Sequence, residues 1–98
     1  MNNSNEIIKY LNSSNKEMKI KSLEFVCENP REDYFSAVVN CFNSVDMDVK
    51  ILAVKAIGII GNDEISNQLI VEYCKTNDSK LKIQIILAYR NMKTQKSF

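Results

Sequence analysis

Apolar residues recur along this chain at the three- and four-residue spacing of helices that face a core. The pattern is most complete in the middle of the chain, where it comprises Val49, Leu52, Ala53, Ala56, Ile57 and Ile60. A stripe of this kind is typical of a helix with one buried face. Ile51 and Val54 widen the stripe, so we expect this helix to pack between neighbours.

The apolar pattern returns at one constant step in two separate helices of each unit. One set of equivalent segments is 18–20, 49–51 and, one residue late, 81–83. The other set is Ile7, Ile8 and Leu11, then Val38, Val39 and Phe42, then Leu69, Ile70 and Tyr73. Units of this length cannot bury an apolar face alone and must stack. The sequence therefore predicts stacked antiparallel hairpins with a period near 31 positions, the step from Lys19 to Lys50.

Local signals predict where each helix begins and ends. Ser14 with Glu17 has the spacing of a capping box, which predicts a helix from there to about Glu28. Asn29 before Pro30 predicts the start of a second helix, which ends near residue 42.

The later boundaries follow from similar signals. Asp46 or Ser44 is expected to open a helix that ends at Gly61, a residue that can adopt the left-handed conformation. Residues 62–64 are expected to start the next helix, and Asn77–Asp78 the last one.

The last helix is expected to fade near Met92. Together with an N-terminal helix over about residues 5–12, the chain then has six helices. We expect one domain over residues 1–98, with a polar N-terminus at 1–4 and a tail at 93–98.

The segment 48–61, DVKILAVKAIGIIG, resembles HEAT repeats, especially the short HEAT-like type named after phycobiliprotein lyases. That type favours Asp-Val and a basic residue, then a pair of alanines three apart, then a Gly-x-x-Gly ending. The other two units depart from this pattern at the positions of Ala53, Ala56 and Gly58. They carry Ser22, Phe25 and Cys27 in the first unit and Ile85, Ala88 and Arg90 in the last.

The resemblance implies an all-α fold, an α-α superhelix or HEAT-like solenoid of about six helices. It implies a binding scaffold in which the helices with the 48–61 pattern (A helices) form the convex side. The alternating B helices line the concave side and carry ligand contacts. The resemblance brings no lyase activity and no catalytic residue, because a fold alone does not fix function.

Composition favours a small helical protein of the cytoplasm. The 98 residues carry a net charge of +1 and contain two glycines and one proline. Three cysteines, without a Cys-x-x-Cys pair, are expected to be reduced and packed. No apolar run approaches the roughly 18 to 20 residues that span a bilayer, so no membrane is expected as partner.

The residues present favour a non-catalytic protein without metal or cofactor. The chain has no histidine, which is the commonest general base and a frequent metal ligand. Carboxylates gather at the predicted helix starts, where they cap free N–H groups. We find no enzyme motif, so the sequence suggests no catalytic residue.

A lysine recurs at one position of each A helix, as Lys19, Lys50 and Lys82. Pairing with loop carboxylates is the simpler explanation, and phosphate binding is the alternative. The suggested partners are Glu17, Asp48 and Asp78.

Charge is unevenly spread. Residues 1–49 carry eight acids and five bases, a balance of −3, whereas residues 50–98 carry four acids and eight bases, a balance of +4. The basic half could meet an acidic partner or a nucleic-acid backbone.

Positions on the B helices opposite the core stripe are candidates for a concave binding surface. These are Lys9, Tyr10, Ala37, Asn40, Cys41, Gln68, Val71, Glu72 and Lys75. Their mixed chemistry suits protein recognition more than a uniform basic groove, although most could simply face solvent.

The last A helix is unusual. Leu87 stands where Glu24 and Lys55 stand in the other units, whereas the ends of solenoids normally become more polar. Ile83, Ile86 and Leu87 would be bare unless the tail folds back with Phe98 as a plug. With Arg90, these positions are candidates for partner binding or for self-association.

The sequence thus leads to two functional hypotheses. The first is a protein–protein interaction module, an adaptor or inhibitor-like regulator that binds through the B-helix face and the C-terminal edge. The alternative is a nucleic-acid-binding module that uses the basic C-terminal half.

Overall fold

The computed structural model describes residues 4–95. Six α-helices and one short 3-10 helix make up the described part, so the predicted all-α fold of about six helices is confirmed. The elements are α1 (Ser4–Leu11), α2 (Lys16–Glu28), η1 (Glu32–Tyr34), α3 (Phe35–Phe42), α4 (Met47–Ile60), α5 (Ser66–Lys75) and α6 (Ser79–Gln95).

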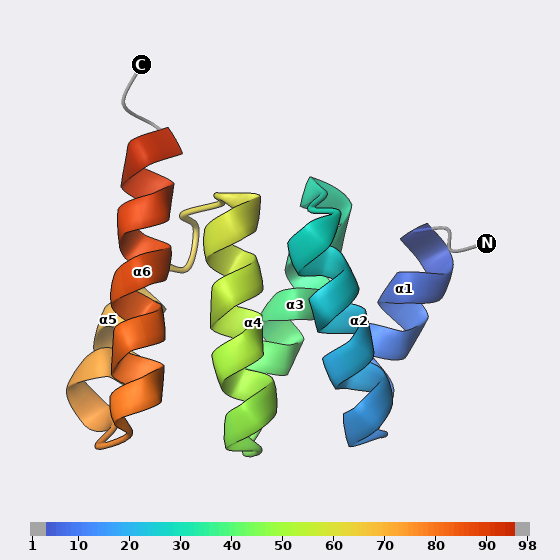
Figure 1. Ribbon diagram of the computed structural model, residues 1–98, viewed down its shortest axis with the longest axis horizontal. Coiled ribbons are helices and arrows are strands. Elements are labelled where there is room, and N and C mark those ends of the chain that lie inside the picture. Colours follow the sequence, from blue (N-terminus) through green and yellow to red (C-terminus); the bar gives the residue numbers. More distant parts are fainter. Residues whose placement is uncertain (1–3, 96–98) are drawn as a thin grey trace.

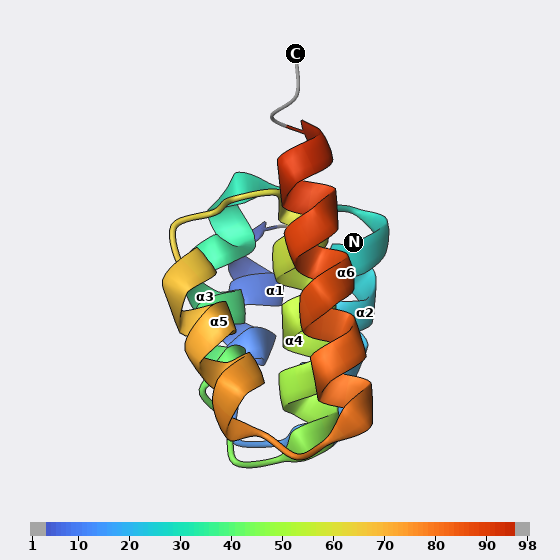
Figure 2. The same cartoon turned by 90° about the vertical axis from the view of Figure 1, so that its left-hand side faces the viewer.

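The helices form two layers (Figures 1 and 2). Helices α2, α4 and α6 lie side by side in one layer, and α1, α3 and α5 lie behind them. Helix α4 occupies the middle, packing against α2 on one side, α6 on the other and α3 in the second layer. The principal extents are 36 × 34 × 17 Å. Because α6 is at the edge of its layer, its outer side has no neighbour among the described helices.

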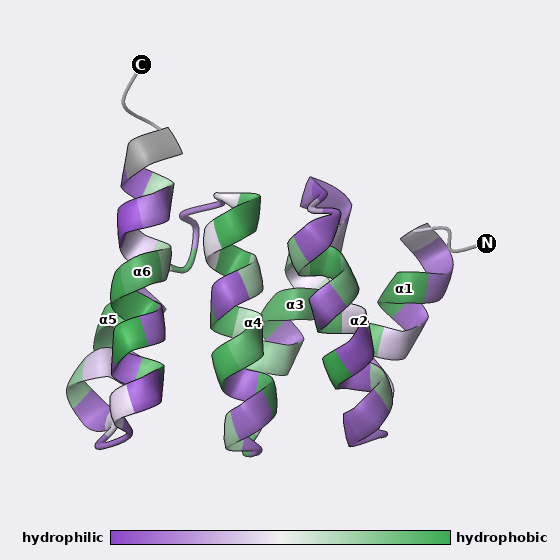
Figure 3. Ribbon diagram, in the orientation of Figure 1, coloured by the Kyte–Doolittle hydropathy of each residue, from purple (hydrophilic) through white to green (hydrophobic). Residues whose placement is uncertain are grey.

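The core lies between the layers and between neighbouring helices of the first layer. Most of the predicted α4 stripe is buried, including Val49, Ala53, Val54, Ala56 and Ile57. Buried apolar side chains from every other helix contact this cluster, among them Leu11, Leu23, Val38, Leu69 and Leu81. Hydrophobic residues accordingly dominate α4, and a further apolar group lies in the middle of α6 (Figure 3).

The three turns that lead into α2, α4 and α6 share one hydrogen-bond pattern. A hydroxyl Oγ accepts from the backbone N–H two residues later, in the pairs Ser13–Asn15, Ser44–Asp46 and Thr76–Asp78. The side chain of the later residue in each pair then caps the helix by accepting from the backbone N–H three residues further on, which belongs to Met18, Val49 or Leu81. Both bonds satisfy donors that a helix start leaves unpaired. The turns therefore recur in step with the apolar pattern, the last one again arriving one residue late.

Two of the expected helix starts need correction. The N-cap of α2 is Asn15 rather than Ser14, because the Asn15 side chain is the one that reaches the Met18 N–H, at 3.1 Å. Asn29 does not open a helix but closes α2, since its backbone N–H and its side-chain amide both donate to the carbonyl of Phe25. The second predicted helix therefore begins later, as η1 followed by α3.

A third start and one end also differ. Helix α5 begins at Ser66 instead of at residues 62–64, because Asn62 accepts from the Glu64 N–H and keeps this segment in a turn. Helix α6 continues to Gln95, past the predicted end at Met92. By contrast, Gly61 closes α4 as predicted, with a φ of 83° in the left-handed region. The predicted Phe98 plug lies outside the described residues.

Helices α4 and α6 approach closely through small residues. A Cβ atom added to Gly58 would lie 2.6 Å from the Cα of Ala88 and 2.7 Å from its Cβ. Near the same contact, the Asn91 side-chain amide donates to the Gly58 carbonyl at 2.7 Å. The small residues that the sequence singled out in this segment thus serve helix–helix packing.

The Asp46 cap predicts an acid-sensitive step in stability. The hydrogen bond from the Val49 N–H, followed by the ammonium of Lys16 at 3.1 Å, lowers the pKa of the Asp46 carboxyl. When the pKa of a carboxyl is lower in the folded state, its contribution to stability is complete above the unfolded-state pKa of about 3.9. That contribution is lost as pH falls through the folded-state pKa. In that pH range we expect the free energy of unfolding of wild type to fall and to approach that of Asp46→Asn, because asparagine keeps the cap without titrating. Urea denaturation between pH 5 and pH 2 tests this, and parallel curves for the two proteins would contradict it.

Candidate functional site

Three large apolar side chains on the outer side of α6 are exposed. Ile83, Ile86 and Leu87 expose 58%, 44% and 46% of their surface, respectively, and we call them the α6 ridge. Positions three and four apart lie on one side of a helix, so the three form a continuous strip. Most large apolar side chains of a folded protein are buried, and a contiguous exposed group is a mark of an interaction site.

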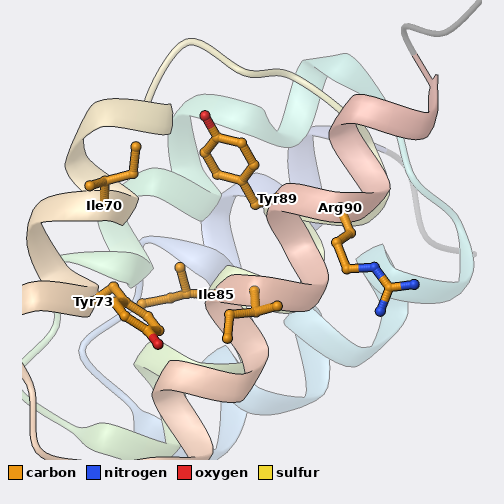
Figure 4. A pocket seen from close by; sticks show the side chains of 6 residues that line it. Ile70, Tyr73, Ile85, Tyr89 and Arg90 are labelled. Atoms are coloured by element: carbon orange, nitrogen blue, oxygen red, sulfur yellow. The ribbon is translucent and has the colours of Figure 1, made fainter.

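A groove runs along one flank of the α6 ridge, between α5 and α6 (Figure 4). It encloses about 280 Å³ and is lined by Ile70, Tyr73, Ile85, Ile86, Tyr89 and Arg90. Ile70 and Tyr73 come from α5, and the Tyr89 ring extends from α6 toward them, whereas Arg90 extends away from α5. Ile70 itself is 44% exposed. This α5–α6 groove therefore offers an apolar floor with a cation at its rim.

A second groove lies on the other flank, between α4 and α6. It encloses about 300 Å³, and its lining residues are Lys55, Gly58, Ile59, Gln84, Leu87, Ala88 and Asn91. Leu87 belongs to both the α6 ridge and this α4–α6 groove. A partner that straddles the ridge could therefore place side chains in both grooves.

The charge of α6 is of one sign. The helix carries Lys80, Lys82, Arg90 and Lys93 and no acidic residue. Lys80, Arg90 and Lys93 are exposed, and each lies three, four or seven residues from a member of the α6 ridge, which puts them on the same side of the helix. The ridge is therefore an apolar strip with positive charge around it.

The predicted concave surface is only partly exposed. Ala37 and Cys41 were expected on it but are buried, since α3 packs its whole apolar side inward, with the Cys41 Sγ donating to the Leu11 carbonyl. Tyr10 is half-buried, and exposed Asn40 donates to the side chain of Asn12. Of the predicted positions on α1 and α3, Lys9 and Asn40 are therefore the exposed ones.

On α5, the predicted residues behave differently from one another. Gln68, Val71 and Lys75 are exposed along one side of the helix, and Val71 exposes 54% of its surface. Glu72 is mostly covered and forms an ion pair with Lys50, with 3.1 Å between Nζ and Oε2. Its charge is thus already balanced within the fold.

The recurrent lysines do not have the partners that the sequence suggested. Lys50 pairs with Glu72 instead of Asp48, and its ammonium lies 5.7 Å from the centre of the Phe42 ring. Lys82 lies over the Tyr73 ring at 5.2 Å. These contacts hold an A-helix lysine against an aromatic residue of the second layer.

Asp48 is bound elsewhere. Lys16 forms ion pairs with Asp46 and with Asp48, each at 3.1 Å, and these hydrogen bonds raise the pKa of the Lys16 ammonium. Lys16 was not predicted to pair with them, because its two partners lie across the contact between α2 and the start of α4. Spacing along the chain does not indicate which side chains meet between two helices, so the sequence carried no signal for these pairs.

The cysteines are free, with Cys41 buried, Cys27 half-buried and Cys74 exposed. Burial raises the pKa of both the Cys27 and the Cys41 thiols, because it disfavours the thiolate. Within residues 4–95, no cluster of three or more side chains suited to a metal ion occurs. None of the helices in this range has the length and apolarity needed to cross a membrane.

Comparisons with protein-family models, with curated proteins and with solved structures find no match to this chain.

Proposed function

We propose that this chain is a non-catalytic protein-interaction module that binds a partner protein through the α6 ridge and the two grooves beside it. The observation that carries the proposal is the exposure of Ile83, Ile86 and Leu87 on one side of one helix. Exposed apolar groups with a polar rim are typical of protein interfaces. An adaptor or inhibitor-like regulator of the cytoplasm is the role we infer, since reduced thiols persist there.

The architecture we infer is a short HEAT-like solenoid of three stacked hairpins. Two features support it: the common hydrogen-bond pattern of the three turns before α2, α4 and α6, and the arrangement of helices in two layers. A non-catalytic role is supported by what the carboxylates do. Asp46 and Asp78 cap helices, and Glu72 neutralises Lys50.

Affinity capture with paired variants tests the proposal. Leu87→Glu places a charge in the α6 ridge and is expected to abolish capture of a specific partner from the source cells. Val45→Glu is the matched control, because Val45 is fully exposed in the turn before α4 and lines neither of the two grooves. Mass spectrometry should find a protein captured by wild type and Val45→Glu but not by Leu87→Glu. If Leu87→Glu retains every captured protein, the ridge is not the interface.

The basic C-terminal half supports a second candidate function, nucleic-acid binding. Helix α6 carries four bases and no acid. Two observations weigh against it: Lys82 is held over Tyr73, and the exposed positions between Lys80 and Arg90 are taken by the apolar Ile83, Ile86 and Leu87. A shift assay with DNA and RNA at low and moderate salt separates the functions, since phosphate contacts weaken steeply with salt.

A further inference from the structure

The outer side of α6 corresponds to a surface of α4 that already binds a helix. The turns before these helices are equivalent, with Asp78 capping α6 as Asp46 caps α4. Counted from these caps, Ile83 and Ile86 correspond to Ile51 and Val54, and Arg90 corresponds to Gly58.

On α4, this surface is partly covered. Val54 and Gly58 are buried and Ile51 is half-buried, whereas Lys55, the equivalent of Leu87, is exposed. Ile51, Val54 and Gly58 are spaced by three and four residues and so share one side of the helix. Gly58 contacts Ala88 of α6, and Val54 is fully buried. The equivalent side of α6 therefore has the spacing and apolar character of a surface that accepts a helix lying alongside.

The shape around the α6 ridge suits the same kind of ligand. The ridge rises between the α5–α6 groove and the α4–α6 groove, and helices pack by placing rows of side chains into such grooves. An amphipathic helix with apolar residues at three- and four-residue spacing would match it.

The charge of α6 indicates which residues should flank the apolar strip of the bound helix. Helix α6 has four basic residues and no acidic one, and the Glu72 carboxylate of neighbouring α5 is paired with Lys50. An occupant with acidic flanks would gain attraction on docking, whereas one with basic flanks would be repelled.

A second copy of this chain fits less well. Two α6 ridges placed face to face would bring like charges together. Of the six large apolar side chains that are exposed among the described residues, five belong to α5 and α6 and the sixth is Val45. The acidic N-terminal half therefore offers the ridge little apolar surface in return.

We propose that the α6 ridge binds an amphipathic α-helix of a partner protein that carries acidic residues beside its apolar strip. The helix lies lengthwise along α6, with apolar side chains in the two grooves and carboxylates near Lys80 and Arg90. This inference rests on the proposed function, since it names the kind of segment that a protein partner would present.

Fluorescence anisotropy with designed peptides tests this inference on the whole 98-residue chain. The first probe is a labelled peptide of about 18 residues, cross-linked into a helix because short helices are marginal in water, with leucines on one face and glutamates beside them. The second probe has lysines in place of the glutamates. We expect the acidic peptide to bind at least about tenfold tighter than the basic one, with the difference shrinking in high salt.

Variants locate the binding. Leu87→Glu should lower affinity for the acidic peptide about tenfold or more, since it removes an apolar contact and adds repulsion, whereas Val45→Glu should not. Lys80→Glu should lower it about threefold, and Lys21→Glu on α2 is its matched control. If Leu87→Glu does not fold, amide chemical-shift changes on wild type replace it, and they should be largest in residues 80–90.

Several results would overturn the inference. These are equal affinity for the two peptides, no binding of the acidic peptide, tighter binding of a single-stranded oligonucleotide than of the acidic peptide, and a concentration-dependent dimer by light scattering that Leu87→Glu abolishes. If the peptides fail to bind as expected, this inference fails but the proposed function can still stand. A cellular partner that is lost only with Leu87→Glu would still support protein binding through the ridge.

Discussion

Replacement of Ile57 by alanine is expected to remove a large part of the stability of this protein. Ile57 is fully buried in the middle of α4, the helix that contacts both neighbours in its layer and the second layer. Truncating a buried isoleucine costs about 2 to 5 kcal/mol, because the transfer energy is lost and a cavity remains. The whole free energy of unfolding of a domain this size is about 5 to 15 kcal/mol.

The same helix supplies a control for this measurement. Ile59 is only two residues away but is partly exposed, and it lines the open α4–α6 groove. Ile59→Ala should therefore cost clearly less than Ile57→Ala in urea denaturation. Equal losses for the two variants would mean that α4 does not bury the side that the structure assigns to the core.

Gly58→Ala is expected to destabilise, although alanine is the better helix former by about 1 kcal/mol. The added Cβ would lie 2.6 Å from the Cα of Ala88, which is backbone and cannot turn aside. Helix α6 would have to move away from α4, and overpacking of this kind typically costs about 1 to 3 kcal/mol. Thermal unfolding measures the net effect.

A second substitution tests the cause of that loss. In the Gly58→Ala background, Ala88→Gly removes the neighbouring Cβ but leaves the Cα in place, so we expect a partial recovery and a favourable coupling energy in the double-mutant cycle. A higher melting temperature for Gly58→Ala than for wild type would show that the helices are not this close.

Local patterns were sufficient for the all-α class and for most of the α4 stripe, but not for Ala37 and Cys41, which were expected at the surface and are buried. The stripe at Val49, Ala53 and Ile57 follows from helical periodicity alone, and it is buried. Gly61 ends α4 as predicted, and Asp46, one of the two residues predicted to begin it, is the N-cap, because each acts through its own backbone neighbourhood. Asn29 misled because asparagine serves either end of a helix, and here its side chain donates to the preceding helix.

The candidate site was predictable in one part and hidden in another. Leu87 could be singled out because it breaks the charge pattern of equivalent positions. The α5–α6 groove could not be inferred, since it depends on how far α5 stands from α6. The partners of Lys50 and Lys16 were also out of reach, because ion pairs between helices depend on side-chain reach and not on spacing along the chain.

The hydrogen bond from Asn91 to the Gly58 carbonyl has a consequence for how the helices align. A slide of α6 along α4 by one turn, about 5.4 Å, would place a larger side chain than that of Ala88 opposite Gly58, where the two helices lie too close to accommodate it. Gly58 provides one of the last four carbonyls of α4, which have no partner within their own helix. The Asn91 amide meets that acceptor in the same alignment that places Ala88 against Gly58, so the hydrogen bond and the packing select one axial position of α6 and of everything that α6 carries.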